Sequence, residues 1–244
     1  DSCVVKGLLS DPLKKQLARS MDALVFGGAV HAGLDSFYRG GSVKEQIESA
    51  LEQVEESGQQ LSSEHPRTEE NLRNLFVQHH VEQEQLADIV PISIDGEPVI
   101  EKSFSMPLGT IEISTDDAMK VYFDTDEDSV EIAVYWEGRI DMLATFRDNL
   151  WLVDHKTTTV MGEKFVDDKL RSSQFLGYYW AGCKLLKEAE GPLTTSTEKE
   201  FYSTDTKIEG VLVNAIALRK KGFEFKRFEI PFSPWKVEEW VTET

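Results

Sequence analysis

The sequence has few cysteines, no long apolar run and no phosphate-binding loop motif, and each absence excludes a class of protein. It has only two cysteines, Cys3 and Cys183, too few for a disulfide framework or for a four-thiolate zinc or iron–sulfur site. A reduced, intracellular setting is therefore expected. No run of 18 apolar residues occurs, so no membrane span is predicted. No Gly-x-x-x-x-Gly-Lys-Ser/Thr loop occurs either, so ATPase or helicase activity is not expected from this chain.

Positive charge is scarce as well. Lys and Arg number 26 against 44 Asp and Glu, which gives a formal net charge of -18. This balance argues against a broad basic face for nucleic acid. Net charge is an average, however, and a metal site needs carboxylates of its own. Many glutamates gather between residues 45 and 70, and we interpret them as a solvated helix face.

Hydrophobic spacing divides the chain near Asp88 into a helical part and a strand-rich part. Helices are predicted over residues 11–38, 43–60 and 69–81, the last with Thr68 as its N-cap. Strands are predicted at 99–106, 121–123, 131–136, 138–146 and 150–157. A helix over 167–187, a polar loop over 191–206, strands at 210–218 and 223–230, and a helix from 234 to 241 follow.

This order of elements predicts an α/β fold. Its central sheet is mixed and mostly antiparallel, helices flank it, and a helical lobe precedes it. We expect residues 1–244 to form a single domain. The helical lobe would cover approximately 11–90 and the sheet core approximately 91–244.

A predicted hairpin carries the strongest chemical signal. If Arg147 and Asp148 form a two-residue turn, Asp141 lies directly opposite Asp154 on the neighbouring strand. Opposed residues on antiparallel strands have Cβ atoms roughly 4.5–5.5 Å apart. Two carboxylates at that separation repel unless a positive charge lies between them, so this pair indicates a divalent-cation site.

Lys156 lies two residues after Asp154, so both side chains point to the same face of the strand. Its ammonium group could reach a water or phosphate beside the cation. The preceding residues 150–153 are apolar, and charged groups at the end of a buried strand are costly unless they are paired or functional. A simple salt-bridged strand end is the alternative interpretation.

Other polar residues are weaker signals taken singly. Gln174 and Tyr178 share one helix face and could hydrogen-bond a phosphate or orient a lysine. His31 lies on a helix among apolar neighbours, where a histidine is more often a packed residue than a ligand. The nearby glycines 27 and 28 each cost about 1 kcal/mol in a helix, and close approach to another backbone is one use for them. His79 and His80 are interpreted as surface or packing residues.

Taken together, these motifs resemble the RecB-like branch of the PD-(D/E)XK nucleases, which includes phage exonucleases and the CRISPR adaptation nucleases. The resemblance spans residues 22 to about 180. Its motifs are Gly27-x-x-x-His31, Glu101 before a short strand, Gly138-Arg139-Ile140-Asp141, Asp154-His155-Lys156 and Gln174-x-x-x-Tyr178. The resemblance implies a restriction-endonuclease-like core and a metal-dependent DNA exonuclease of phage or bacterial recombination and repair, in the cytoplasm.

The resemblance also implies a role for each matching residue. His31, Asp141, Asp154 and the backbone carbonyl of His155 would bind Mg²⁺ or Mn²⁺, with Glu101 in a secondary role near the metal. Lys156 would position the attacking water and stabilise the charged transition state, with support from Gln174 and Tyr178. DNA is the implied partner, and the acidic lobe could bind an annealing protein or a helicase.

This chain departs from the family pattern in two ways. It lacks the four cysteines that hold an iron–sulfur cluster in several members. His155 stands where the family often has an aromatic or apolar residue, and we expect its side chain to point away from the metal.

The alternatives to an exonuclease are a structure-selective or restriction-like endonuclease, a non-catalytic DNA-binding module, and a helical interaction protein. The last of these would leave the Asp141–Lys156 hairpin unexplained. Digestion polarity, strand preference and oligomeric state stay open.

Overall fold

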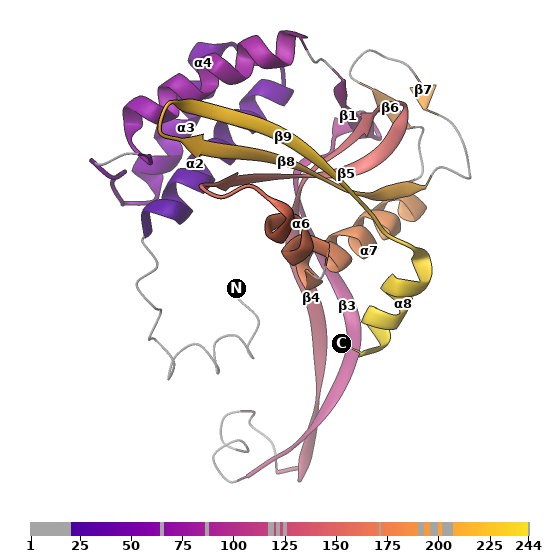
Figure 1. The fold of residues 1–244 in the computed structure, drawn as a ribbon. Coiled ribbons are helices and arrows are strands. Elements are labelled where there is room, and N and C mark those ends of the chain that lie inside the picture. Colours follow the sequence, from indigo (N-terminus) through magenta and orange to yellow (C-terminus); the bar gives the residue numbers. More distant parts are fainter. Residues whose placement is uncertain are drawn as a thin grey trace.

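The computed structural model describes residues 21–63, 66–85, 88–116, 120, 123, 126–170, 172–189, 193–195, 200–201 and 207–243. Within these residues the strands form one nine-stranded mixed sheet with helices on both faces (Figure 1). Helices α2–α4 cover one face, and α6–α8 lie on the other. The predicted α/β fold, a mixed sheet flanked by helices, is thereby confirmed.

The first helical layer follows the predicted order. Its members are α2 (Met21–Tyr38), α3 (Val43–Glu56) and α4 (Glu69–Gln85). Ser42 begins α3 with a capping box, in which its side chain accepts from the Glu45 amide and the Glu45 carboxylate accepts from the Ser42 amide. The predicted N-cap of α4 is confirmed, because Thr68 Oγ1 accepts from the Asn71 amide at 3.2 Å. Helix α3 ends at Glu56, four residues before the predicted end, and the predicted helical residues 11–20 lie outside the described residues.

Close helix packing in this layer depends on Gly33. A Cβ on this glycine would lie 2.1 Å from the Phe76 ring of α4, whereas the Cβ positions of Gly27 and Gly28 would meet neighbours at ordinary distances of 3.6 and 4.0 Å. The suggested close backbone approach at residues 27 and 28 is therefore wrong, and α2 runs through both without interruption. A buried cluster that includes Phe26, Leu34 and Phe76 joins these helices to Ile216 and Leu218 of the sheet.

The sheet is built around long antiparallel strands. Its main path runs β7-β6-β1-β4-β5-β8-β9, with β2 paired to β1 and β3 paired to β4. The strands are β1 (Ile89–Ile94), β2 (Glu97–Pro98), β3 (Ile100–Ser114), β4 (Ser129–Phe146), β5 (Asn149–Thr158), β6 (Leu193–Thr195), β7 (Glu200–Phe201), β8 (Ile208–Arg219) and β9 (Gly222–Pro231). Strands β5 and β8 pair in parallel, and the other strand pairs among the described residues are antiparallel. The prediction of a mostly antiparallel sheet is therefore confirmed.

The β4–β5 hairpin has the predicted register. Phe146 pairs with Asn149 and Met142 with Val153, so Arg147 and Asp148 form the two-residue turn. Both turn residues have positive φ, 50° and 65°. This backbone matches a tight turn whose twist suits the flanking strands.

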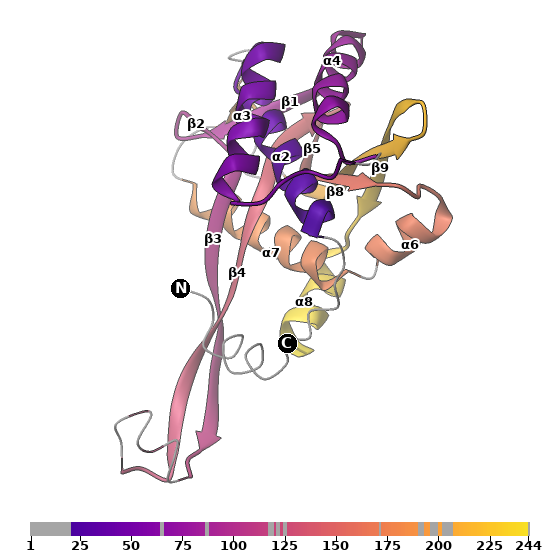
Figure 2. The ribbon, with the colours of Figure 1, turned by 90° about the vertical axis from the view of Figure 1, so that its left-hand side faces the viewer.

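Several predicted boundaries are wrong. The predicted strands at 131–136 and 138–146 are one 18-residue strand, β4, and β3 extends far beyond residue 106 to Ser114. The outer ends of β3 and β4 leave the body as a two-stranded ribbon (Figures 1 and 2). Of the predicted strand at 121–123 only Phe123 is described, and it is helical. Short strands β6 and β7 lie where a polar loop was predicted.

The second helical layer consists of α6 (Glu163–Leu170), α7 (Ser173–Glu188) and α8 (Pro234–Glu243). The single helix predicted over 167–187 is thus two helices, with Ser172 as the N-cap residue of α7. Phe175, Tyr179 and Ala181 of α7 belong to the hydrophobic core beneath the sheet. Gly177 allows close contact, because a Cβ there would lie 2.2 Å from the Trp136 indole nitrogen of β4.

Candidate metal centre and active site

Three carboxylates lie in one row across neighbouring strands β3, β4 and β5. The flanking pairs Ile100–Met142 and Lys102–Ile140 place Glu101 opposite Asp141. On the other side, the ladder between β4 and β5 ends at the pair Met142–Val153, one step before Asp141 and Asp154. Instead of continuing the ladder, Asp141 Oδ2 accepts a hydrogen bond from the His155 amide at 2.8 Å. The predicted proximity of Asp141 and Asp154 follows from this register.

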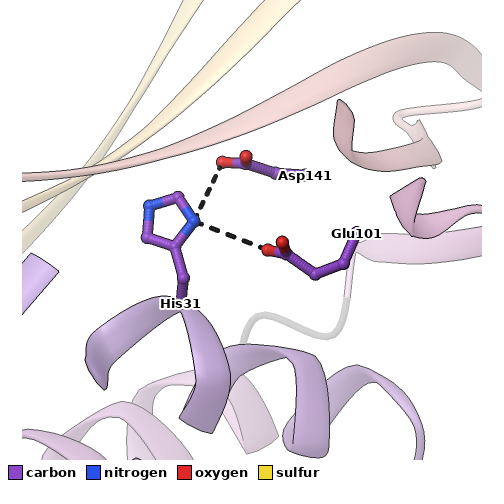
Figure 3. A group of neighbouring side chains, drawn as sticks. All are labelled: His31, Glu101 and Asp141. Carbon is purple, nitrogen blue, oxygen red and sulfur yellow. Dashed lines mark ion pairs between the residues drawn. The ribbon is translucent and has the colours of Figure 1, made fainter. Parts of the chain in front are cut away.

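His31 reaches the row from helix α2. Its Nδ1 lies 3.5 Å from Glu101 Oε1 and 3.5 Å from Asp141 Oδ2 (Figure 3). Its Nε2 lies 2.9 Å from the His155 carbonyl oxygen, which can only accept. Nε2 therefore carries a proton, and in the neutral ring the lone pair is on Nδ1, directed at the two carboxylates.

Glu101 is held in an unusual backbone conformation. Its φ is 52°, in the left-handed region that a non-glycine residue rarely adopts. Such conformations often occur where function requires a particular side-chain direction. Arg139 Nε lies 2.6 Å from Glu101 Oε2, so the two side chains form an ion pair. Their relative orientation is not that of a hydrogen bond. The arrangement holds the Glu101 carboxylate beside His31.

Burial of the carboxylates in this cluster disfavours their charged forms. Burial raises the pKa of Asp141 to about 6, with a further increase from the negative charge of Asp154 and opposition from His31. Burial also raises the pKa of Asp154. Burial acts to lower the pKa of His31, but Glu101 and Asp141 outweigh it and raise the pKa overall. The cluster is therefore short of positive charge, which a cation would supply.

Lys156 lies beside Asp154 on the same face of β5, as predicted from their spacing. Its Nζ is 2.6 Å from Asp154 Oδ1, and its side chain is 25% exposed while that of Asp154 is 2% exposed. Burial acts to lower the pKa of Lys156, but Asp154 and Asp141 outweigh it and raise the pKa overall. Lys156 is therefore a cation at neutral pH with access to solvent.

Gln174 and Tyr178 are joined on α7 by a hydrogen bond of 2.7 Å from Gln174 Nε2 to the Tyr178 hydroxyl. Burial raises the pKa of Tyr178, and the nearby charges of Asp141, Asp154 and Lys156 also act on it. The Tyr178 ring packs edge-on against Phe104 of β3. The structure thus brings this pair to the carboxylate row, while Gln174 remains exposed.

The His155 side chain lies on the opposite face of β5, as expected. It is 3% exposed, and its Nδ1 lies 3.1 Å from the Asn214 side-chain amide of β8. The sequence analysis did not single out Asn214. A signal was present, because Asn214 is the only polar residue in the run Val211–Leu218.

The donor set fits a divalent cation. Among the described residues, His31, Glu101 and Asp141 offer ligand atoms that all lie within 4.8 Å of one another. Asp154 Oδ2 is also buried, and it has no hydrogen-bond partner among the described residues. This oxygen can therefore still accept a hydrogen bond or bind a cation. Two carboxylates with one imidazole, and a further carboxylate oxygen free to accept, suit Mg²⁺ or Mn²⁺.

Comparison with known protein families agrees with this geometry. The family model of the PD-(D/E)XK nuclease superfamily matches residues 6–228. The chain belongs to the PD-(D/E)XK nuclease superfamily, and it is a nuclease whose family uses divalent metals and acts on DNA. The search of curated proteins finds no match. Among the described residues, no helix is both long and apolar enough to cross a membrane.

Proposed function

We propose that the protein is a Mg²⁺- or Mn²⁺-dependent exodeoxyribonuclease of phage or bacterial DNA recombination, repair or processing. The observation that carries the nuclease assignment is the row Glu101–Asp141–Asp154, joined by His31 at one end and by Lys156 at the other. The exonuclease assignment rests on the motif set, which resembles the RecB-like and phage exonuclease branch.

The metal site is proposed to consist of His31 Nδ1 with the carboxylates of Glu101, Asp141 and Asp154. The resemblance implies the His155 carbonyl as a further metal ligand. That oxygen accepts from His31 Nε2 and so fixes the tautomer of the ring, and we propose that it supports the cation through His31. A cation bound there would lower the pKa of a coordinated water and so supply the nucleophile near neutral pH. The water oxygen forms a bond to phosphorus and one phosphorus–oxygen ester bond breaks, leaving a phosphomonoester and a free hydroxyl.

Lys156 is proposed to stabilise the negative charge that develops on the phosphoryl oxygens. Its ammonium is held by Asp154 Oδ1 at 2.6 Å, which fixes its direction. Because it stays protonated, it acts as an electrostatic and hydrogen-bond donor group instead of a base. Gln174 and Tyr178, bonded to each other, are proposed to orient Lys156 and to contact a DNA phosphate.

Residues 1–244 are proposed to act as one domain, because the buried cluster of helices α2–α4 includes Ile216 and Leu218 of the sheet. The exposed glutamates of α3 are proposed as a contact for a protein partner such as an annealing protein or a helicase, and the setting as cytoplasmic. These residues are Glu45, Glu48, Glu52, Glu55 and Glu56. A pull-down with such a partner that is unchanged when these charges are reversed would refute the contact.

A degradation assay tests the exonuclease proposal. The substrates are end-labelled linear duplex, single strand and covalently closed circular DNA, each with Mg²⁺, Mn²⁺ or EDTA. Metal-dependent loss of linear DNA with an intact circle is expected, and the labelled end released first gives the polarity. Cutting of the closed circle would show an endonuclease instead. Absence of cutting on every substrate would favour a non-catalytic DNA-binding module.

A further inference from the structure

His155 stands between Asp154 and Lys156, but its side chain enters the opposite side of the sheet. There its ring stacks on Tyr38 of α2, with centroids 5.6 Å apart and planes inclined by 19°. Asn214 lies directly beside it in the parallel pairing of β5 and β8, and Asn214 Nδ2 is 3.1 Å from His155 Nδ1. His155 is 3% exposed and Asn214 1%, so both are fixed by packing.

The backbone of the same residue contacts two members of the metal cluster. The His155 amide donates to Asp141 Oδ2 at 2.8 Å, and its carbonyl accepts from His31 Nε2 at 2.9 Å. Side chain and backbone share one Cα, so the direction of the ring constrains the direction of both backbone groups. A small rotation at His155 would displace the Asp141 carboxylate and the His31 imidazole together.

Helix α2 contacts His155 at two points. His31 and Tyr38 are seven residues apart, two turns along one face of the helix. One contacts the His155 carbonyl and the other its ring. The position of the helix that carries His31 is therefore tied to the His155 side chain as well as to the carboxylate row.

Asn214 is a polar residue in a buried, apolar stretch of β8. The neighbouring strand residues Val213 and Ala215 are fully buried, and a buried side-chain amide is costly unless it is hydrogen-bonded. Its bond to His155 offsets that cost. An apolar residue at position 214 would pack without this requirement, so the bond to His155 is the contact that accounts for an amide here.

We propose that Asn214, acting through the His155 side chain, is a positioning residue that holds Asp141 and His31 in the geometry that binds the divalent cation. This inference rests on the proposed metal site. It adds the His155 and Asn214 side chains, which lie on the opposite face of the sheet from Asp154 and Lys156. Hydrogen-bonded groups behind metal ligands typically change metal affinity by roughly 10–100-fold when they are removed.

Mn²⁺ affinity of the purified full chain, measured by titration calorimetry without DNA, tests this role. The variant is Asn214→Ala, and the matched control is Asn71→Ala, which removes an asparagine hydrogen bond to the Pro66 carbonyl in the helical layer. Asn214→Ala is expected to weaken Mn²⁺ binding roughly tenfold, with the control unchanged. A Kd for Asn214→Ala within about twofold of the wild type would overturn the inference.

A double variant separates positioning from packing. His155→Phe with Asn214→Leu keeps an aromatic ring against Tyr38 and removes both polar partners together, so no buried amide is left unpaired. Thermal stability is expected to return close to that of the wild type while Mn²⁺ affinity stays low. Wild-type Mn²⁺ affinity in this stable double variant would refute the positioning role. If the wild type itself bound no Mn²⁺, the proposed metal site would fail first, and the inference with it.

Discussion

Acidification is expected to destabilise the protein through His79. This histidine lies in α4 with no exposed surface, edge-on to Phe37 and 5.6 Å from the Phe225 ring of β9. Neither ring nitrogen has a hydrogen-bond partner among the described residues. Burial lowers its pKa from 6.5 to about 4, with further lowering by the positive charge of Arg227.

The sign and the size follow from this shift. The folded pKa is below the unfolded one, so the stability is fully present above pH 6.5 and is lost as the pH falls towards 4. The whole difference corresponds to about 3 kcal/mol. Between pH 7 and pH 5 the loss due to His79 is about 2 kcal/mol, because the unfolded chain takes up its proton in this window while the folded protein does not.

Urea unfolding of the wild type and of His79→Leu, in EDTA at pH 7 and pH 5, measures this contribution. Other groups titrate in both proteins, so the difference between them isolates His79. The free energy of unfolding of the wild type should fall by about 2 kcal/mol more than that of the variant. Equal pH dependence in the two proteins would refute the argument.

Three further predictions concern packing, capping and the site. Gly210→Ala should lower the free energy of unfolding, measured by urea titration, by more than about 2 kcal/mol, because the new Cβ would lie 2.1 Å from the Ile230 carbonyl oxygen. Gly162→Ala is the control, since a Cβ at Gly162 would lie in open space. Ser42→Ala should cost about 1 kcal/mol in the same assay by removing a capping box, and an unchanged midpoint would contradict this. Tyr178→Phe should lower the single-turnover rate of DNA cleavage roughly tenfold with little change in melting temperature, and an unaltered rate would show that its hydroxyl has no part in the reaction.

Local patterns in the sequence predicted the geometry of the hairpin that carries Asp141, Asp154 and Lys156. The β4–β5 register depends on a two-residue turn and on alternation along each strand, and both are properties of a short segment. The placement of Asp154 and Lys156 on one face follows from strand geometry alone. The N-cap at Thr68 and the β8–β9 pair were predictable for the same reason.

Features that depend on distant parts of the chain were not predictable in the same way. Asn214 comes beside His155 only because β5 and β8 pair in parallel across 59 residues of sequence. The left-handed backbone of Glu101 is imposed by its neighbours, since glutamate has no preference for it. Strands β6 and β7 are too short to show alternation. The division into α6, which ends at Leu170, and α7, which begins at Ser173, falls inside a continuous helical pattern of the sequence.

The central claim is that Asp141, Asp154 and Lys156 form a metal-dependent site for phosphodiester hydrolysis. The most direct measurement is single-turnover cleavage of end-labelled linear DNA by the wild type, Asp141→Asn and Lys156→Ala, each with Mg²⁺ and with EDTA, after circular dichroism has shown that all three are folded. Cleavage is expected only for the wild type with Mg²⁺, with both variants reduced by at least about a hundredfold. Cleavage that persists in EDTA, or in folded Lys156→Ala at the wild-type rate, would contradict the account.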